Sequence, residues 1–312
     1  MKFIKIILLA GFLISFSNLT LNANIKALPE DRLMAKGLTE KECCQQMQKA
    51  LQKKKWNDAI EYGNSLREYR SKTPSGVEAL YFLGISYFEK GNLEKANELF
   101  TEYLTKDFMP KYFERTMEYK FQIAEKYHNG AGKQLFGLEK MPAWIPAEED
   151  ALKLYDEVIN SLPQSKIAIK AFFNKAQLHF KFEEYKEAIE AAENLISKYS
   201  KHELAIESYL LISQSYLRQA DPKHHENDLL NLAQLNLARF EKTFPLEERI
   251  SDVKKDIAEI EEIYAQGLYD VAQFYSKKKQ KAAVEIYYRK IKSDFPKSKI
   301  AQKIVRLENS KK

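Results

Sequence analysis

Residues 77–113 carry the pattern that decides the class of fold. The stretch reads VEALYFLGISYFEKGNLEKANELFTEYLTKDFMPKYF, and its spacing of Leu, Gly, Tyr, Ala, Phe and Pro matches a tetratricopeptide repeat, a pair of antiparallel helices. Gly84 and Ala96 fall on the facing sides of the two helices, where small side chains let the backbones approach. Gly91 and Asn92 fall at the turn, because both residue types tolerate the left-handed conformation at a helix end. This match indicates a binding module and leaves its ligand open.

Related patterns recur along the chain. Ala59 precedes Ala96 by 37 positions, and Ala151 precedes Ala188 by the same 37, which is close to one repeat with a slightly long turn. The string P-x-S-K-I-A occurs at 163–168 and again at 296–301. We interpret both copies as repeat junctions, in which proline ends one helix and serine caps the next.

Helical periodicity extends over most of the chain, and only 10 Gly and 9 Pro in 312 residues interrupt it. It predicts an all-α fold, a right-handed superhelical solenoid of five to six tetratricopeptide-like helix pairs with a C-terminal capping helix. We expect N-terminal repeats over 28–163 and C-terminal repeats over 164–312. The late helices are predicted at 204–219, 229–244, 247–275, 282–295 and 300–307.

The N-terminus has a different composition. Lys2 and Lys5 precede an apolar run of about a dozen residues, which is too short for an ordinary membrane span and suits a secretory signal. We assign 1–27 to a signal peptide or, alternatively, to an uncleaved N-terminal anchor, and expect an exported protein. No lipobox cysteine follows the run. The two cysteines, Cys43 and Cys44, are adjacent, and we expect small, partly buried residues rather than a redox pair.

An insertion at 128–146 interrupts the third helix pair with glycines, prolines and apolar residues. A loop of this length is usually functional or folded against its own scaffold. Its aromatic content favours folding against the scaffold.

Catalytic motifs are not recognisable in the sequence. It shows no phosphate-binding glycine loop, no paired metal motif and no nucleophile elbow. His224, His225, Glu226 and Asp228 form the one group that suggests a metal, and a solvated loop explains them better. The net charge of +6 comes from alternating charges, which favours solvated faces over a nucleic-acid surface. We therefore predict a protein that is not an enzyme and has no cofactor, no metal and no nucleic-acid partner.

A partner-binding surface is predicted from the repeat register. In such solenoids the first helices of successive pairs line a concave surface, and five apolar residues fall on it. Either they form a groove for an extended peptide with alternating apolar side chains, or they pack against the neighbouring pair or the insertion. The residues are Tyr81, Ile85, Phe88, Phe173 and Phe180.

From about residue 42 to 307 the arrangement resembles the BamD family of outer-membrane assembly proteins, also called the ComL or competence-lipoprotein family. The resemblance rests on the helix pairs behind an export signal, the insertion sequence at 133–138, the P-x-S junction, and the segment 265–275. In that segment Tyr269, Ala272 and Tyr275 match the family's Tyr-x-x-Ala-x-x-Tyr core. The chain departs from the family in lacking the lipidated cysteine that members usually carry.

The resemblance implies a non-enzymatic periplasmic scaffold for β-barrel assembly at the inner face of the outer membrane. Its N-terminal repeats would bind the C-terminal signal of unfolded barrel proteins, and its C-terminal repeats would hold the barrel assembly subunit. Membrane association would then be indirect, or through an uncleaved N-terminus. The alternative is another periplasmic tetratricopeptide adaptor, of the Tol or cell-division type, which the missing lipid cysteine favours.

Overall fold

The protein is described by a computed structural model over residues 37–134, 143–223 and 227–309. The predicted signal peptide or anchor at 1–27 lies outside the described residues. So do the centre of the insertion, at 135–142, and three members of the suggested metal group, His224, His225 and Glu226.

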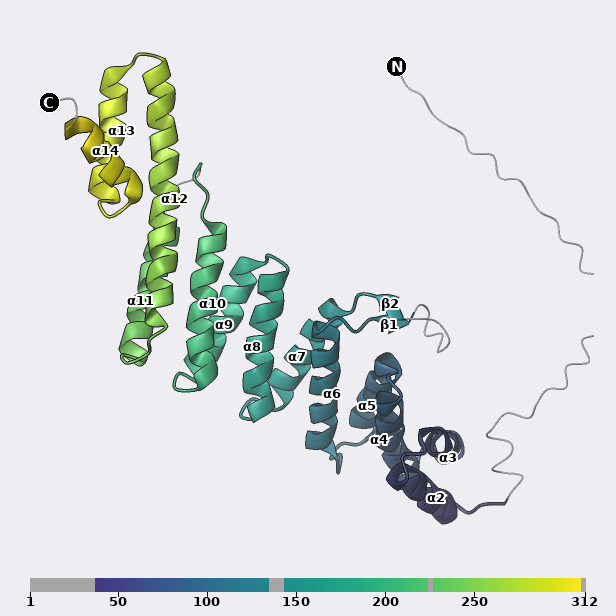
Figure 1. The fold of residues 1–312 in the computed structure, drawn as a ribbon. Helices are drawn as coiled ribbons and strands as arrows, with labels where there is room; N and C mark the ends of the chain where they lie inside the picture. The colour runs from purple at the N-terminus through teal and green to yellow at the C-terminus, as the bar shows by residue number, and fades with distance from the viewer. Residues whose placement is uncertain (1–36, 135–142, 224–226, 310–312) are drawn as a thin grey trace, which may run out of the picture.

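Thirteen helices and one short two-stranded ribbon make up the described residues. The helices form six successive pairs and a last single helix (Figure 1), which confirms the predicted all-α repeat solenoid with its capping helix. The helices are α2 (Glu40–Gln52), α3 (Trp56–Tyr69), α4 (Pro74–Glu89), α5 (Leu93–Lys106), α6 (Phe113–His128), α7 (Glu148–Ser161), α8 (Lys166–Lys181), α9 (Tyr185–Lys198), α10 (Glu203–Gln219), α11 (Asn227–Thr243), α12 (Ile250–Lys277), α13 (Lys281–Asp294) and α14 (Lys299–Asn309).

The pairs follow one another in a row from α2 at one end to α14 at the other (Figure 1). Most contacts join helices that are neighbours in the chain. In addition, α8 contacts both α6 and α10, and α10 contacts α12. The first helices of these later pairs therefore form a continuous face, with α7, α9 and α11 behind it.

Close packing within a pair depends on one small residue in the first helix. A Cβ atom added to Gly84 of α4 would lie 2.5 Å from a ring carbon of Phe100 in α5, and Ala96 and Phe100 are both fully buried. Glycine is therefore needed at position 84 because a larger side chain would clash with the Phe100 ring of the facing helix. The corresponding first-helix positions hold Ala124, Ala176 and Ala272, all fully buried.

The second helices show the matching feature. A fully buried alanine occupies the fourth position of α3, α5, α7 and α9. Ala59, Ala96, Ala151 and Ala188 therefore occupy the same place in four pairs, as their spacing in the sequence predicts.

The turns within the second, fourth and sixth pairs each contain one left-handed residue at the same place. It is Gly91 in the second pair, with φ of 80°, and the next residue, Asn92, accepts a hydrogen bond from the backbone of Lys95 as the cap of α5. The equivalent residues of the fourth and sixth pairs are Glu183 and Lys279, with φ of 62° and 58°. These two residues have a left-handed backbone conformation, which costs free energy for any residue with a side chain.

Both copies of the P-x-S-K-I-A string begin a helix, as predicted. Ser165 Oγ accepts a hydrogen bond from the backbone N–H of Ala168 at 3.1 Å, and Ser298 Oγ accepts one from Ala301 at 3.0 Å. Each hydroxyl also donates to the carbonyl three residues before it, at 2.8 Å. Both alanines are buried, so the motif starts the helix and its packed face together.

A buried lysine connects the second and third pairs. The Lys120 ammonium on α6 donates to Asn97 Oδ1 at 2.9 Å and Thr101 Oγ1 at 2.7 Å, both on α5. It also pairs with the Glu157 carboxylate of α7 at 2.7 Å. Burial lowers the pKa of Lys120, and Glu157 opposes that shift. Because every ammonium proton has a partner, the charge ties three helices together instead of disrupting the core.

The described part of the insertion forms the antiparallel ribbon of β1 (Lys133–Gln134) and β2 (Ala143–Ile145). Lys133 pairs with Asp150 at the start of α7, which holds the ribbon to the solenoid. Trp144 is 72% exposed. The expectation that the insertion's aromatic residues pack on the scaffold is therefore wrong for Trp144, because its strand holds the side chain away from the helices.

The cysteines behave as expected from their context. Cys43 is buried and Cys44 partly buried, and both are free thiols. Burial raises the pKa of Cys43 to about 11, so its thiol is a packing group at neutral pH.

We predict that Gly84→Ala lowers the free energy of unfolding by about 1–2 kcal/mol. The new methyl group meets the buried Phe100 ring, and the cost of overpacking exceeds the gain in helix propensity. Chemical denaturation followed by circular dichroism measures the change. In the control, Phe100→Leu in the same chain should make Gly84→Ala less harmful. Equal effects in both backgrounds would contradict this packing account.

We predict that Lys279→Gly raises the free energy of unfolding by about 0.5–1 kcal/mol, because glycine removes the left-handed strain of the α12–α13 turn. Lys278→Gly is the matched control, since Lys278 has φ of −82° and gains nothing from glycine. Thermal melting of both variants checks the prediction. A rise in both, or in neither, would show that the turn is not strained.

Candidate functional site

The face lined by the first helices is the place to look for a partner site. Two of the five predicted residues are buried there. Tyr81 is 6% exposed and stacks on Tyr112, with ring centroids 4.3 Å apart and planes at 11°. Phe88 is 9% exposed and meets the Tyr119 ring edge-on at 5.2 Å. Packing against the neighbouring pair, one of the two interpretations, thus accounts for the apolar character of Tyr81 and Phe88.

The other three predicted residues are partly exposed. Ile85 and Phe173 pack at the edge of the hydrophobic cluster of the N-terminal pairs. Phe180 packs with the C-terminal cluster and meets the Tyr185 ring edge-on at 5.5 Å. The five residues do not converge, because α6 lies between α4 and α8 (Figure 1). Their contact with a partner stays a prediction.

A cleft of about 560 Å³ lies at α8, α10 and α12. The cleft opens on the first-helix face, and it contains carboxylates that have no ion-pair partner among the described residues. Three of its side chains are apolar and three are charged. They are Phe180, Leu217, Ile263, Arg218, Asp256 and Glu259.

Of these residues, the sequence predicts only Phe180 as a partner contact. The repeat register of the second and fourth pairs does not extend to the inner face of α12. Asp256, Glu259 and Ile263 are spaced at i, i+3 and i+7 and share one face of a helix. In the sequence, the cleft could have been predicted from these two acidic residues beside an apolar residue on the inward face of α12.

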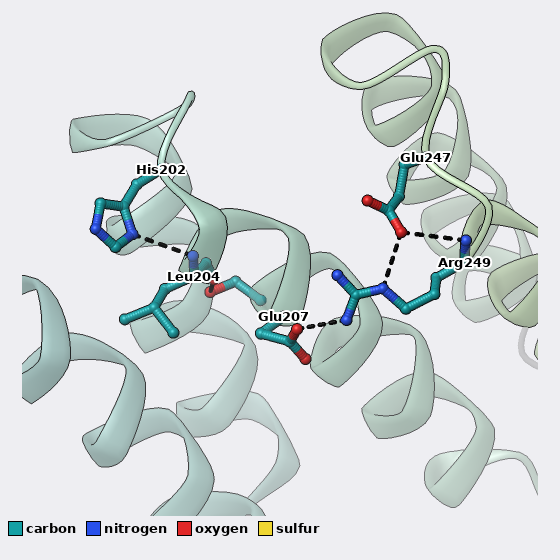
Figure 2. Close-up of polar contacts among 6 residues, drawn as sticks. His202, Leu204, Glu207, Glu247 and Arg249 are labelled. Carbon is teal, nitrogen blue, oxygen red and sulfur yellow. Dashed lines mark hydrogen bonds and ion pairs between the residues drawn. The ribbon is translucent and has the colours of Figure 1, made fainter.

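Polar contacts join α10 to the start of α12, outside the residues that line the cleft. Figure 2 shows Arg249, just before α12, between Glu247 and Glu207 of α10. Its Nε donates to Glu247 Oε1 at 2.8 Å, and its other guanidinium nitrogen pairs with Glu207. These hydrogen bonds raise the pKa of Arg249, so its charge is permanent. Nearby, His202 Nδ1 accepts from the backbone N–H of Leu204 at 3.1 Å and caps α10.

The carboxylates in the cleft lack such partners. Burial raises the pKa of Asp256, and the neighbouring charges of Glu259 and Asp252 add to the rise. Asp252 is paired with Lys255 at 2.9 Å. Among the described residues no lysine or arginine nitrogen lies within 4 Å of the Asp256 or Glu259 carboxylates.

Ser213 of α10 lies beside Asp256, and the hydroxyl favours the ionised carboxylate. The Ser213 hydroxyl is fully buried, and its contact with Asp256 does not meet hydrogen-bond geometry. Ser213 occupies the position that Gly84 and Ala176 fill in other first helices.

Metal binding and membrane crossing are two other roles that the described part of the chain could have. No group of three or more His, Cys, Asp or Glu side chains is placed to hold a metal ion there. None of the described helices combines the length and the apolar character that crossing a bilayer requires.

Comparison with protein families gives two matches. Residues 147–311 match the YfiO family, described as an outer membrane lipoprotein, and residues 46–107 match a tetratricopeptide repeat family. The second match covers most of the stretch from which the repeat class is predicted, residues 77–107 of 77–113. No curated protein matches the chain.

Solved structures with similar backbones share little sequence with the chain. The MamA protein is 18% identical with a TM-score of 0.37, over 68% of this chain and 97% of MamA. PilF of Pseudomonas aeruginosa is 12% identical with a TM-score of 0.30, over 86% and 96%. PilW, a type IV pilus biogenesis factor, is 11% identical with a TM-score of 0.29, over 85% and 98%. Scores this low carry no argument about function.

The family match is the stronger finding, since it spans more than half of the chain and includes the helices that form the cleft. It confirms the family resemblance found in the sequence. The chain therefore belongs to the YfiO, or BamD-type, family of outer membrane lipoproteins and is built from tetratricopeptide-type helix pairs.

Proposed function

We propose that this protein is a non-enzymatic periplasmic scaffold in the assembly of outer-membrane β-barrel proteins. It binds peptides of unfolded barrel proteins and also binds the barrel assembly subunit. The observation that carries the proposal is the family match over 147–311, which covers helices that present a continuous face with a cleft in it. Helix pairs of this kind serve as protein-interaction surfaces.

The solenoid offers different surfaces to the two partners. One cluster of buried hydrophobic residues draws mainly on α2 to α8, and a second draws on α8 to α14. In the proposal, the N-terminal repeats at 28–163 receive the unfolded chain, and the C-terminal repeats at 164–312 hold the assembly subunit. Holding both on one scaffold raises their effective concentration, so no bond chemistry is needed.

Three of the predicted groove residues are suited to such contacts. Ile85, Phe173 and Phe180 keep part of their apolar surface in solvent, while packing fixes the rest. Aromatic side chains held in this way contribute contact area without losing much conformational freedom on binding. The protein would sit at the inner face of the outer membrane, held by its partners or by an uncleaved N-terminus.

We predict that a photo-crosslinking residue at Phe180, in the full chain in cells, forms adducts with the barrel assembly subunit. The same residue at Ile85 should capture unfolded outer-membrane proteins. Gln234, which is exposed on α11 away from the first-helix face, is the matched control position and should give no adduct. Mass spectrometry of the adducts identifies the partners.

Two results would contradict the proposal. One is the absence of both partner classes from all adducts although the protein is folded and exported. The other is capture of Tol or cell-division proteins alone, which would establish the alternative adaptor function.

A further inference from the structure

The cleft at α8, α10 and α12 has a chemistry that points to one kind of ligand. We propose that it binds a lysine or arginine side chain of an extended polypeptide segment, whose apolar neighbours pack on Phe180, Leu217 and Ile263. The cleft lies in the C-terminal repeats, so the inference rests on the proposed function in taking an extended segment of the barrel assembly subunit as the ligand, and it adds the chemistry by which that segment is recognised.

Unpaired negative charge is the first observation. Asp256 and Glu259 lie one turn apart on the same face of α12, so their charges repel each other. Two carboxylates near the cleft helices do have cations: Glu207 of α10 pairs with Arg249, and Glu241 of α11 pairs with Lys254 at 2.8 Å. A cation supplied by a ligand would relieve the repulsion and satisfy a carboxylate that is partly removed from water.

The Ser213 hydroxyl is the second, independent observation. It is the one buried side-chain oxygen or nitrogen without a hydrogen-bond partner in the described part of the chain. Close packing of the pair does not require it, since glycine or alanine fills this position in other first helices. A lysine or arginine bound at Asp256 would hold that carboxylate in place beside the Ser213 hydroxyl, which could then donate a hydrogen bond to it. Buried polar atoms in native proteins normally have such partners.

The shape of the cleft favours a polypeptide over a free ion. About 560 Å³ is within the range of pockets that hold organic ligands. Phe180, Leu217 and Ile263 are partly exposed in it, and a lysine or arginine stem with apolar neighbours would cover them. Arg218, exposed at the same cleft, offers N–H donors to the backbone carbonyls of an extended segment.

A peptide-binding experiment with the full chain tests the inference. The probe is a fluorescein-labelled peptide, Leu-Ser-Leu-Arg-Leu-Ser-Leu, and its reference peptide has glutamine in place of arginine. Fluorescence anisotropy should show the arginine peptide binding at least tenfold more tightly. Asp256→Asn and Glu259→Gln should each weaken its binding about three- to tenfold and leave the glutamine peptide unaffected. Glu285→Gln, an exposed change of equal charge on α13, should change neither affinity.

Circular dichroism establishes that each variant is folded, and both substitutions keep the shape of the side chain. Equal affinity for the two peptides, no binding of either, or the same loss in Glu285→Gln as in Asp256→Asn would overturn the inference. Failure of the inference is distinguishable from failure of the proposed function. If Phe180 crosslinks to the assembly subunit but the arginine peptide does not bind, the cleft assignment alone falls. If the peptide binds as expected but no assembly partner is captured, the proposed function alone falls.

Discussion

Each helix pair of this solenoid depends on two backbones that come close enough for side chains to interlock. One small residue per first helix makes this approach feasible, and at Gly84 even a methyl group would enter the Phe100 ring. Because the contact lies within a pair, and each pair packs mainly on the next, the core is built from local contacts repeated along the chain. A packing defect in one pair therefore destabilises the adjacent pairs first.

The local character of these contacts explains what the sequence could predict. Serine caps and buried alanines are set by residues three or four positions apart, so Ser165 and Ser298 could be placed without knowing the rest of the fold. Among the turns of the second, fourth and sixth pairs, the left-handed residue was predictable only at Gly91. At Glu183 and Lys279 the side chain gives no hint of it, and the geometry follows from the helices on either side.

The repeat register alone does not predict the candidate site, because the site also depends on contacts with other helices. The register shows which face of α4 points inward, but Tyr112 and Tyr119 from the following connection and helix decide that Tyr81 and Phe88 are covered. The cleft likewise forms because α12 is longer than the helix it pairs with. With 28 residues against 14 in α13, its N-terminal half extends beyond its partner and packs on α10 and α11. Asp256 lies in that half, and the Arg249 contacts join the start of that half to α10.

The charge of the whole chain makes the acidic cleft informative. A net charge of +6 repels basic ligands at long range, yet at physiological salt the screening length is only about 8 Å. Inside the cleft the nearest charges therefore determine whether a basic ligand is attracted, and two carboxylates and one guanidinium line it. Such a site does not speed the approach of a basic segment by long-range attraction. It discriminates after contact, through desolvated neighbours such as Asp256, and this gives selectivity among extended chains that all present similar apolar side chains.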